Sequence, residues 1–230
     1  MKALLLFTFS ILFVVNLSAQ NDDDWDSRRY DIDNFLAIYL EGSYKVFLTQ
    51  GNESALTVKT PDGDVFDELD VDNWSDELRV VVDRDFINYE RIHLYVTFKN
   101  LDEIKVQGGL NLSTDGYLDL NDLYVQVEGG AKIDLEVKAA DIELVGEGGV
   151  LVQLKGVAEK LDVKLSGAGH VDAEDLRVND ATFKIEGVGT GSVHAVETLY
   201  AKIEGVGKVR YTGNPKVTRD IEGLGSVKRD

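Results

Sequence analysis

The chain has 230 residues, a formal net charge of −18 and no cysteine. The lack of cysteine excludes disulfides, thiolate metal sites, a cysteine nucleophile and lipid attachment at an N-terminal cysteine. The acidic balance argues against nucleic acid or an anionic membrane surface as a partner.

The first 19 residues read as a secretory signal peptide. A short basic start, Met1-Lys2, precedes an apolar run from Ala3 to Val15, and Ala19 places a small residue before Gln20. This pattern predicts cleavage near Ala19-Gln20 and an exported protein, either periplasmic or extracellular at the cell surface. No other apolar run approaches the length of a membrane-spanning helix, so we expect no membrane span in the mature chain.

Residues 20–29 form an acidic leader with aspartates at positions 22, 23, 24 and 26. The spacing lacks the glycine and the terminal glutamate of a calcium-binding loop. We therefore predict a flexible, solvated tail at 20–29 and a single folded domain over 30–230.

The first part of that domain, residues 30–103, reads as irregular β-structure. Apolar residues alternate over 36–40, 44–48, 56–58, 78–82 and 92–98, which predicts half-buried strands. Pro61-Asp62-Gly63 predicts a turn. The segment 62–74 has no clear pattern, and 83–91 reads as a loop.

From residue 104 onward a short motif recurs. Phe183–Gly189 (FKIEGVG) returns as Ala201–Gly207 (AKIEGVG) and, in shorter form, as Ile221–Gly225 (IEGLG). Fainter copies precede them, and the last glycine of each copy falls at 109, 130, 149, 169, 189, 207 and 225. A recurrence near 20 residues is typical of a solenoid.

Apolar residues alternate within each copy, which indicates a strand, and the glycines that follow indicate a sharp corner with positive φ. The fold class that follows is all-β: a single-stranded right-handed parallel β-helix with coils of about 18–21 residues. An antiparallel sandwich is the alternative. The predicted inward columns are Val125/Ile142/Val163/Phe183/Ala201 and Val127/Leu144/Leu165/Ile185/Ile203/Ile221, and the predicted corner glycines are Gly130, Gly149, Gly167, Gly169, Gly187, Gly189, Gly205, Gly207, Gly223 and Gly225.

Charged residues align on the outward face of the same strands. Lysines at 164, 184 and 202 form one column, and Glu186, Glu204 and Glu222 form the next. We interpret these columns as a solvated, charge-balanced face. A cation such as calcium held between the glutamates is the alternative, although the column offers no loop to complete the six or more oxygens that calcium requires.

Other motifs do not meet the requirements of a site. Gly187–Gly191 and Gly205–Lys208 resemble phosphate loops but lack the required spacing, and no helix follows them. Gly129–Asp134 is one imperfect copy of a calcium-binding nonapeptide. The histidines, His93, His170 and His194, lack ligand spacing. We predict no catalytic residue and no cofactor.

The opening pattern Phe35-x-x-Ile38-x-Leu40-x-Gly42, continued to Gln50-Gly51, and the closing Gly-x-Gly-Ser-Val-Lys of Gly223–Lys228 resemble the bacterial head GIN domain family. The resemblance covers residues 30–229. That family is described as a "putative auto-transporter adhesin". The resemblance implies a β-helix, an envelope or exported location and no catalytic residues.

Two hypotheses of function follow. The first is a non-enzymatic exported protein of the cell envelope that binds an unknown protein or glycan, or has a structural role. The second is a polysaccharide lyase or hydrolase, since β-helices host such enzymes and an acidic chain supplies carboxylates. Only the loops at 62–73 and 83–91 are long enough to build a cleft for it.

Overall fold

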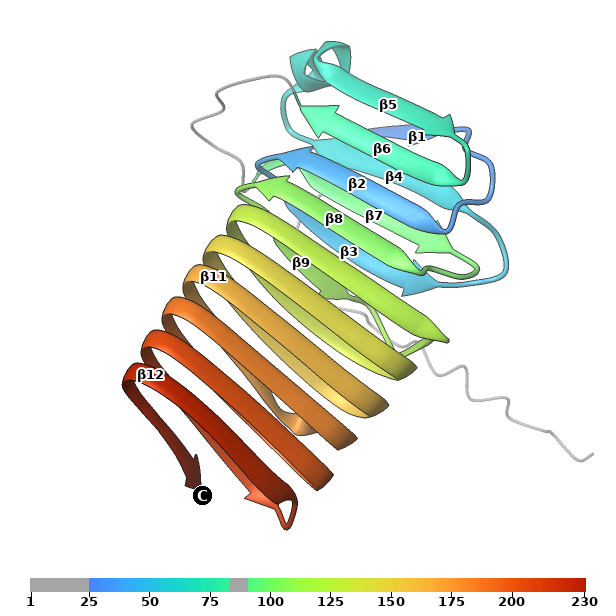
Figure 1. Cartoon of the computed structure of the whole chain (residues 1–230). Coiled ribbons are helices and arrows are strands. Elements are labelled where there is room, and N and C mark those ends of the chain that lie inside the picture. The colour runs from blue at the N-terminus through green and yellow to red at the C-terminus, as the bar shows by residue number, and fades with distance from the viewer. Residues whose placement is uncertain (1–24, 83–90) are drawn as a thin grey trace, which may run out of the picture.

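The computed structural model describes residues 25–82 and 91–230. The predicted signal peptide, the first part of the acidic leader and nearly all of the 83–91 loop lie outside the described residues. Figure 1 shows the arrangement of the elements. The strands are β1 (Asp26–Tyr30), β2 (Ala37–Gly42), β3 (Lys45–Gln50), β4 (Ala55–Thr60), β5 (Leu69–Trp74), β6 (Glu77–Val82), β7 (His93–Phe98), β8 (Glu103–Gly108), β9 (Asn111–Thr114), β10 (Leu118–Asp119), β11 (Asp122–Gly213) and β12 (Lys216–Arg229), with one 3-10 helix, η1 (Gly63–Asp67).

The prediction of a single-stranded right-handed parallel β-helix is wrong for this chain, because its strands form one mixed sheet. Strand β4 is antiparallel to both β1 and β7, and β5 is antiparallel to β6. All three antiparallel pairs lie within residues 26–98, which lack the Gly-x-Gly pattern. The sheet curls around one apolar core, and its main order is β1-β4-β7-β3-β9-β11-β8-β2-β6-β5.

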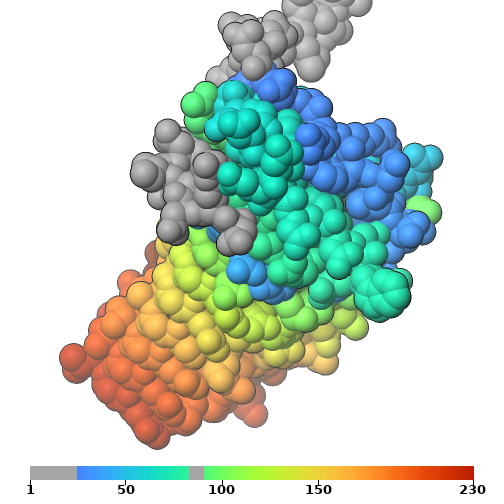
Figure 2. Space-filling model, turned by 90° about the horizontal axis from the view of Figure 1, so that it is seen from above, coloured from blue at the N-terminus to red at the C-terminus, as the bar shows by residue number. Residues whose placement is uncertain are grey.

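The pairs made by β8 to β12 are parallel. Strand β11 pairs with β8, β9, β10 and β12, and its long ribbon bends repeatedly in Figure 1 as it winds toward the C-terminus. In the pair with β12, Ile203 lies opposite Ile221 and Gly205 opposite Gly223. Figure 2 looks onto the end of the molecule that the first strands form. Their blue-to-green atoms lie toward the upper right of the view, and the orange and red atoms of β11 and β12 lie at the lower left.

Side chains that alternate along each strand fill the core. Both predicted inward columns are buried as far as Ala201 and Ile203, which are 0% exposed. Ile221 departs from the prediction with 39% exposure. Its partner Ile203 is covered by β12, whereas β12 is paired only with β11 among the described residues.

Two features of the N-terminal part differ from expectation. Strand β1 begins at Asp26, inside the segment expected to be a flexible leader, because its backbone pairs with β4. The segment 62–74, which no pattern assigned, contains η1 and β5. Strands β5 and β6 are joined through Ser75 and Asp76, whose φ values of 53° and 63° are those of a tight hairpin turn.

In the repeated corner motif, positive φ occurs at the first glycine of the Gly-x-Gly and not at the second. Gly187 has φ +119° and Gly205 has φ +125°, and Gly167 and Gly223 behave likewise. The expectation of positive φ is wrong at the other predicted corner glycines, which are Gly130, Gly149, Gly169, Gly189, Gly207 and Gly225. Gly189 and Gly207 are second glycines of this motif. At those second glycines the constraint is space, since a Cβ would lie 2.8 Å from Ile185 Cγ2 and 2.9 Å from Ile203 Cγ2 respectively.

Candidate functional site

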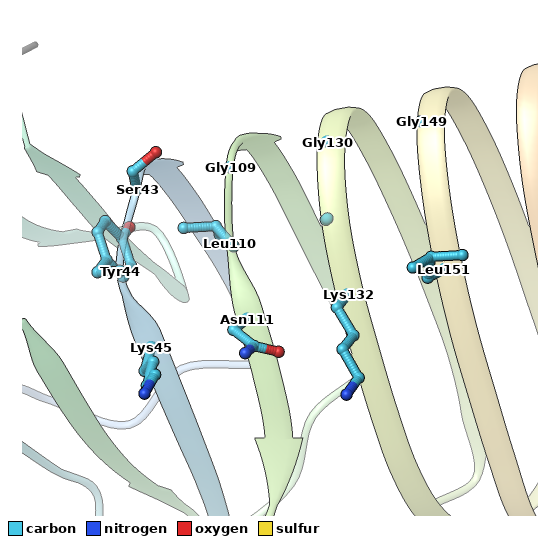
Figure 3. A pocket seen from close by; sticks show the side chains of 11 residues that line it. Ser43, Tyr44, Lys45, Gly109, Leu110, Asn111, Gly130, Lys132, Gly149 and Leu151 are labelled. Carbon is cyan, nitrogen blue, oxygen red and sulfur yellow. The ribbon is translucent and has the colours of Figure 1, made fainter. Parts of the chain in front are cut away.

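A groove runs across neighbouring strands at the bend that follows β2 and β8 and recurs along β11 (Figure 3). Its first part has a volume of about 430 Å³, and its second part about 490 Å³. Gly149 and Leu151 line both parts, so the two parts adjoin at these residues. We call this feature the bend groove; the residues that line it are Ser43, Tyr44, Lys45, Gly109, Leu110, Asn111, Gly130, Ala131, Lys132, Gly149, Val150, Leu151, Ala168, Gly169, His170, Val188, Gly189 and Thr190.

The bend groove is open because glycines form much of its floor. A Cβ placed on Gly130 or Gly149 would meet no atom within 4 Å, and neither residue has positive φ. Larger side chains would therefore fit the backbone at both positions and would fill the groove. The open space follows directly from the absence of side chains at these two positions.

Three polar side chains form a row at the N-terminal end of the bend groove. Lys45 on β3 lies opposite Asn111 on β9, and Asn111 lies opposite Lys132 on β11. Figure 3 shows the three side chains in line, with Leu151 next in the row. Neither lysine forms an ion pair with any residue that the structure describes. This end therefore presents two uncompensated positive charges with an amide between them.

The other end of the bend groove is mostly apolar, with His170 and Thr190 as its polar side chains. Leu151 is 54% exposed and Val188 59% exposed. The same bend carries Val206 and Leu224 beyond the groove, and these two side chains are also exposed and lie opposite each other in the β11–β12 register. Exposed aliphatic side chains gathered along one bend mark a binding surface more often than isolated ones do.

The predicted glutamate column lies on β11 and β12. Glu204 lies directly opposite Glu222, and Lys202 forms an ion pair with Glu204. The hydrogen bond from Lys202 to Glu204 raises the pKa of Lys202. Within residues 25–82 and 91–230, no group of three or more potential ligands comes together around a metal position. These contacts describe a face on which lysine and glutamate charges offset each other.

The three histidines do not converge. Nδ1 of His170 lies 2.6 Å from Oγ1 of Thr190, in the second part of the bend groove. The ring of His93 packs against Trp25, with centroids 4.5 Å apart, and against Phe47. His194 lies farther along β11, half-buried.

A polar cluster lies on the outer surface of β2, β6 and β8, away from the residues that line the bend groove. The hydroxyl of Tyr39 lies within hydrogen-bond distance of both Glu41 and Gln107, and the Arg79 guanidinium lies over the Tyr39 ring. Burial and the neighbouring Glu41 raise the pKa of Tyr39. The hollow beside this cluster has a volume of only about 50 Å³, too small for a sugar unit. The carboxylate-lined cleft that a polysaccharide enzyme requires is not formed here.

Sequence reasoning missed the bend groove. Lys45 and Lys132 lie 87 positions apart, and no pattern in the sequence links them. One signal was available: the middle residue of Gly-x-Gly is valine or leucine at 188, 206 and 224, although this position is solvent-exposed at a strand bend. An apolar residue repeated at an exposed bend could have pointed to this surface.

Comparison with known proteins finds one matching family model. A family model described as "Putative auto-transporter adhesin, head GIN domain" matches residues 34–215. Among curated proteins, none matches this sequence.

Several solved structures share the fold. A protein from Bacteroides fragilis described as a putative adhesin has a TM-score of 0.82 at 22% identity, over 90% of this chain and 97% of the other. A protein from Parabacteroides distasonis described as a putative lipid binding protein has a TM-score of 0.66 at 20% identity, over 91% and 98%. A protein from Parabacteroides merdae described as a putative adhesin has a TM-score of 0.65 at 21% identity, over 91% and 97%. At these identities the likeness shows the fold alone.

Proposed function

Because the chain belongs to the head GIN domain family, we propose that it is an exported, non-enzymatic protein of the cell envelope that binds a partner through its surface. The observation that carries the proposal is the bend groove: it is open and partly apolar, and no carboxylate lines it. Such a surface holds a ligand but supplies no acid–base pair for hydrolysis.

The comparisons support a binding role in general terms. The three solved structures of similar fold are described as "putative adhesin" in two cases and as "Putative lipid binding protein" in the third. Export is supported by the basic and apolar pattern of the first 19 residues. In the described part of the chain, no helix has the length and apolar character needed to cross a membrane.

The binding proposal is tested by retention. Purified protein fixed on a resin is exposed to envelope extract, and the same protein is applied to a glycan array. We expect saturable retention of at least one envelope component or glycan. No retention in either experiment counts against the proposal.

Two further measurements test the location and the absence of catalysis. A tagged copy is followed by cell fractionation with and without residues 1–19, and we expect the exported fraction to disappear on deletion. Reducing-end release is measured on acidic and neutral polysaccharides, and we expect none. Release that depends on the carboxylates at Glu41, Glu103 or Glu128 would favour the polysaccharide enzyme instead.

A further inference from the structure

We propose that the bend groove binds a single-chain amphiphile with an acidic headgroup, of the fatty-acid type. The headgroup lies between Lys45 and Lys132, and the acyl chain runs over Gly130 and Gly149 toward Val188. This inference rests on the proposed binding function and names the class of ligand and its site.

The size of the bend groove suits such a ligand. Each of its two parts, at about 430 Å³ and 490 Å³, falls in the range of roughly 300–1,000 Å³ that small-molecule sites occupy. The row that begins at Lys45 and Asn111 continues through Lys132, Leu151 and His170 to Thr190. At ~4.8 Å per strand spacing the five steps of this row make a length of roughly 24 Å, which suits an extended long acyl chain.

The floor and sides of the groove suit an acyl chain. The glycine floor at 130 and 149 leaves a smooth backbone surface, and Leu151 and Val188 are exposed beside it. Each methylene that leaves water for this surface adds to the affinity, because burial of apolar surface is favourable. Tyr44 offers no ring face to a sugar, because it is 1% exposed and its hydroxyl donates to the Val80 carbonyl over 2.9 Å.

The charges suit an anionic headgroup at one end only. Lys45 and Lys132 lie one strand to either side of Asn111, which places them about 10 Å apart along the row at ~4.8 Å per strand. A carboxylate between them accepts hydrogen bonds from either ammonium group and from the Asn111 amide. The net charge of −18 disfavours docking onto an anionic bilayer, so the ligand is a monomeric amphiphile and not a membrane surface.

The test uses the purified protein and cis-parinaric acid, a fatty acid that fluoresces when its chain enters an apolar site. We expect saturable binding, displacement by palmitate, and weaker displacement by palmitate methyl ester, which lacks the charge. Vesicles of anionic phospholipid form a separate arm, and we expect no co-sedimentation. Absence of saturable binding, or co-sedimentation that accounts for all of the signal, overturns the inference.

Substitutions locate the site. Gly149→Leu fills the shared middle of the groove without positive φ or a steric clash, so we expect an unchanged circular dichroism spectrum and loss of binding. Val157→Leu adds apolar volume at an exposed position outside the groove and serves as the control. Equal binding by Gly149→Leu and the wild type, with both folded, overturns the inference.

Paired lysine substitutions test the headgroup. Lys45→Gln combined with Lys132→Gln is expected to weaken fatty-acid binding about tenfold or more while leaving the methyl ester within about twofold. Lys164→Gln combined with Lys184→Gln makes the same change in net charge on another face and is expected to have no effect. An equal loss of fatty-acid binding in the two double variants would contradict a specific headgroup site. If every fatty-acid experiment fails while an envelope component is still retained, only this inference is removed. If the fatty-acid experiments and the retention experiment both fail, the proposed function is removed as well.

Discussion

Gly205 lies against the backbone of Gly187, so closely that a Cβ on Gly205 would be 2.3 Å from the Gly187 carbonyl oxygen. The same relationship joins Gly187 to Gly167 and Gly223 to Gly205. The obstructing atom is a carbonyl oxygen within a hydrogen-bonded sheet, so it cannot move aside as the end of a flexible side chain could. Glycine at these positions is required by both φ and space.

Gly205→Ala is therefore expected to be strongly destabilising. Positive φ and the backbone clash together lower the free energy of unfolding by roughly 2–6 kcal/mol. Gly149→Ala is the matched control, since its Cβ meets open space at an ordinary φ. The control is expected to be neutral or stabilising by up to ~1 kcal/mol. Urea unfolding of both variants checks this, and equal midpoints would contradict it.

Phe183 is the largest side chain in the two predicted inward columns. It is 0% exposed, and its ring fills the space beside Gly191. Phe183→Ala is expected to lower the free energy of unfolding by about 3–5 kcal/mol through lost burial and the cavity left behind. Leu224→Ala removes a side chain that is 78% exposed, and we expect a change within about 0.5 kcal/mol. Similar losses in the two variants, measured by thermal unfolding, would contradict the assigned core.

Tyr44 makes stability depend on alkaline pH. Burial raises the pKa of its phenol above the usual 10.0, and the hydroxyl donates to the Val80 carbonyl over 2.9 Å. The unfolded phenol loses its proton near pH ~10 while the folded one keeps it. Stability is thus fully present below about pH 10 and falls as pH rises above it, by up to ~1.4 kcal/mol per pH unit.

Tyr44→Phe separates this contribution from other alkaline effects. We expect a loss of roughly 1–3 kcal/mol at neutral pH, because the Val80 carbonyl loses its buried donor. We also expect a shallower decline of stability above pH ~10 than in the wild type. Urea unfolding across this pH range measures both, and parallel slopes would contradict a buried, protonated Tyr44.

Asp172 makes stability depend on acidic pH. Partial burial raises its pKa, but the hydrogen bond from Ser192, at 2.8 Å, and the backbone N–H of Glu174 outweigh it, so the pKa is lowered. A lowered folded pKa stabilises the protein above the unfolded value near ~3.9, and this stability is lost as pH falls through the folded pKa.

Ser192→Ala removes the hydroxyl that holds the Asp172 carboxylate ionised. We expect the pKa of Asp172 to move upward, as followed by NMR of the carboxyl carbon. Ser226→Ala, at an equivalent bend outside this contact, is the control and should leave the titration unchanged. An unaltered pKa in Ser192→Ala would contradict the role given to the Ser192 hydroxyl.

Local alternation predicted the strands and most of the core. Ile38 and Leu40 on β2, like Val46 and Leu48 on β3, are buried as their period of two indicates. Pairing partners were not predictable in the same way. Strand β1 pairs with β4, whose residues lie 26 to 34 positions further along the chain, and most side chains of β1 are polar and exposed. The β5–β6 turn carries Ser75 and Asp76 where glycine or asparagine would have indicated it.

The candidate site was harder to predict because its geometry depends on register. Lys45, Asn111 and Lys132 come from three strands whose alignment no local sequence feature fixes. The glutamate column, in contrast, was visible because its members recur at a regular interval. Regular spacing therefore identified the charged face and the glycines of the groove floor. The polar end of the groove depends on three residues that share no motif.

Arg219 has a consequence for how these molecules behave at high concentration. It lies opposite Ala201, whose side chain is fully buried, yet Arg219 itself is exposed. A second molecule that stacked onto β12 would have to remove this guanidinium from water without a partner, which costs several kcal/mol. Arg219 therefore opposes edge-to-edge association of β12 with another molecule, and with it the growth of fibres.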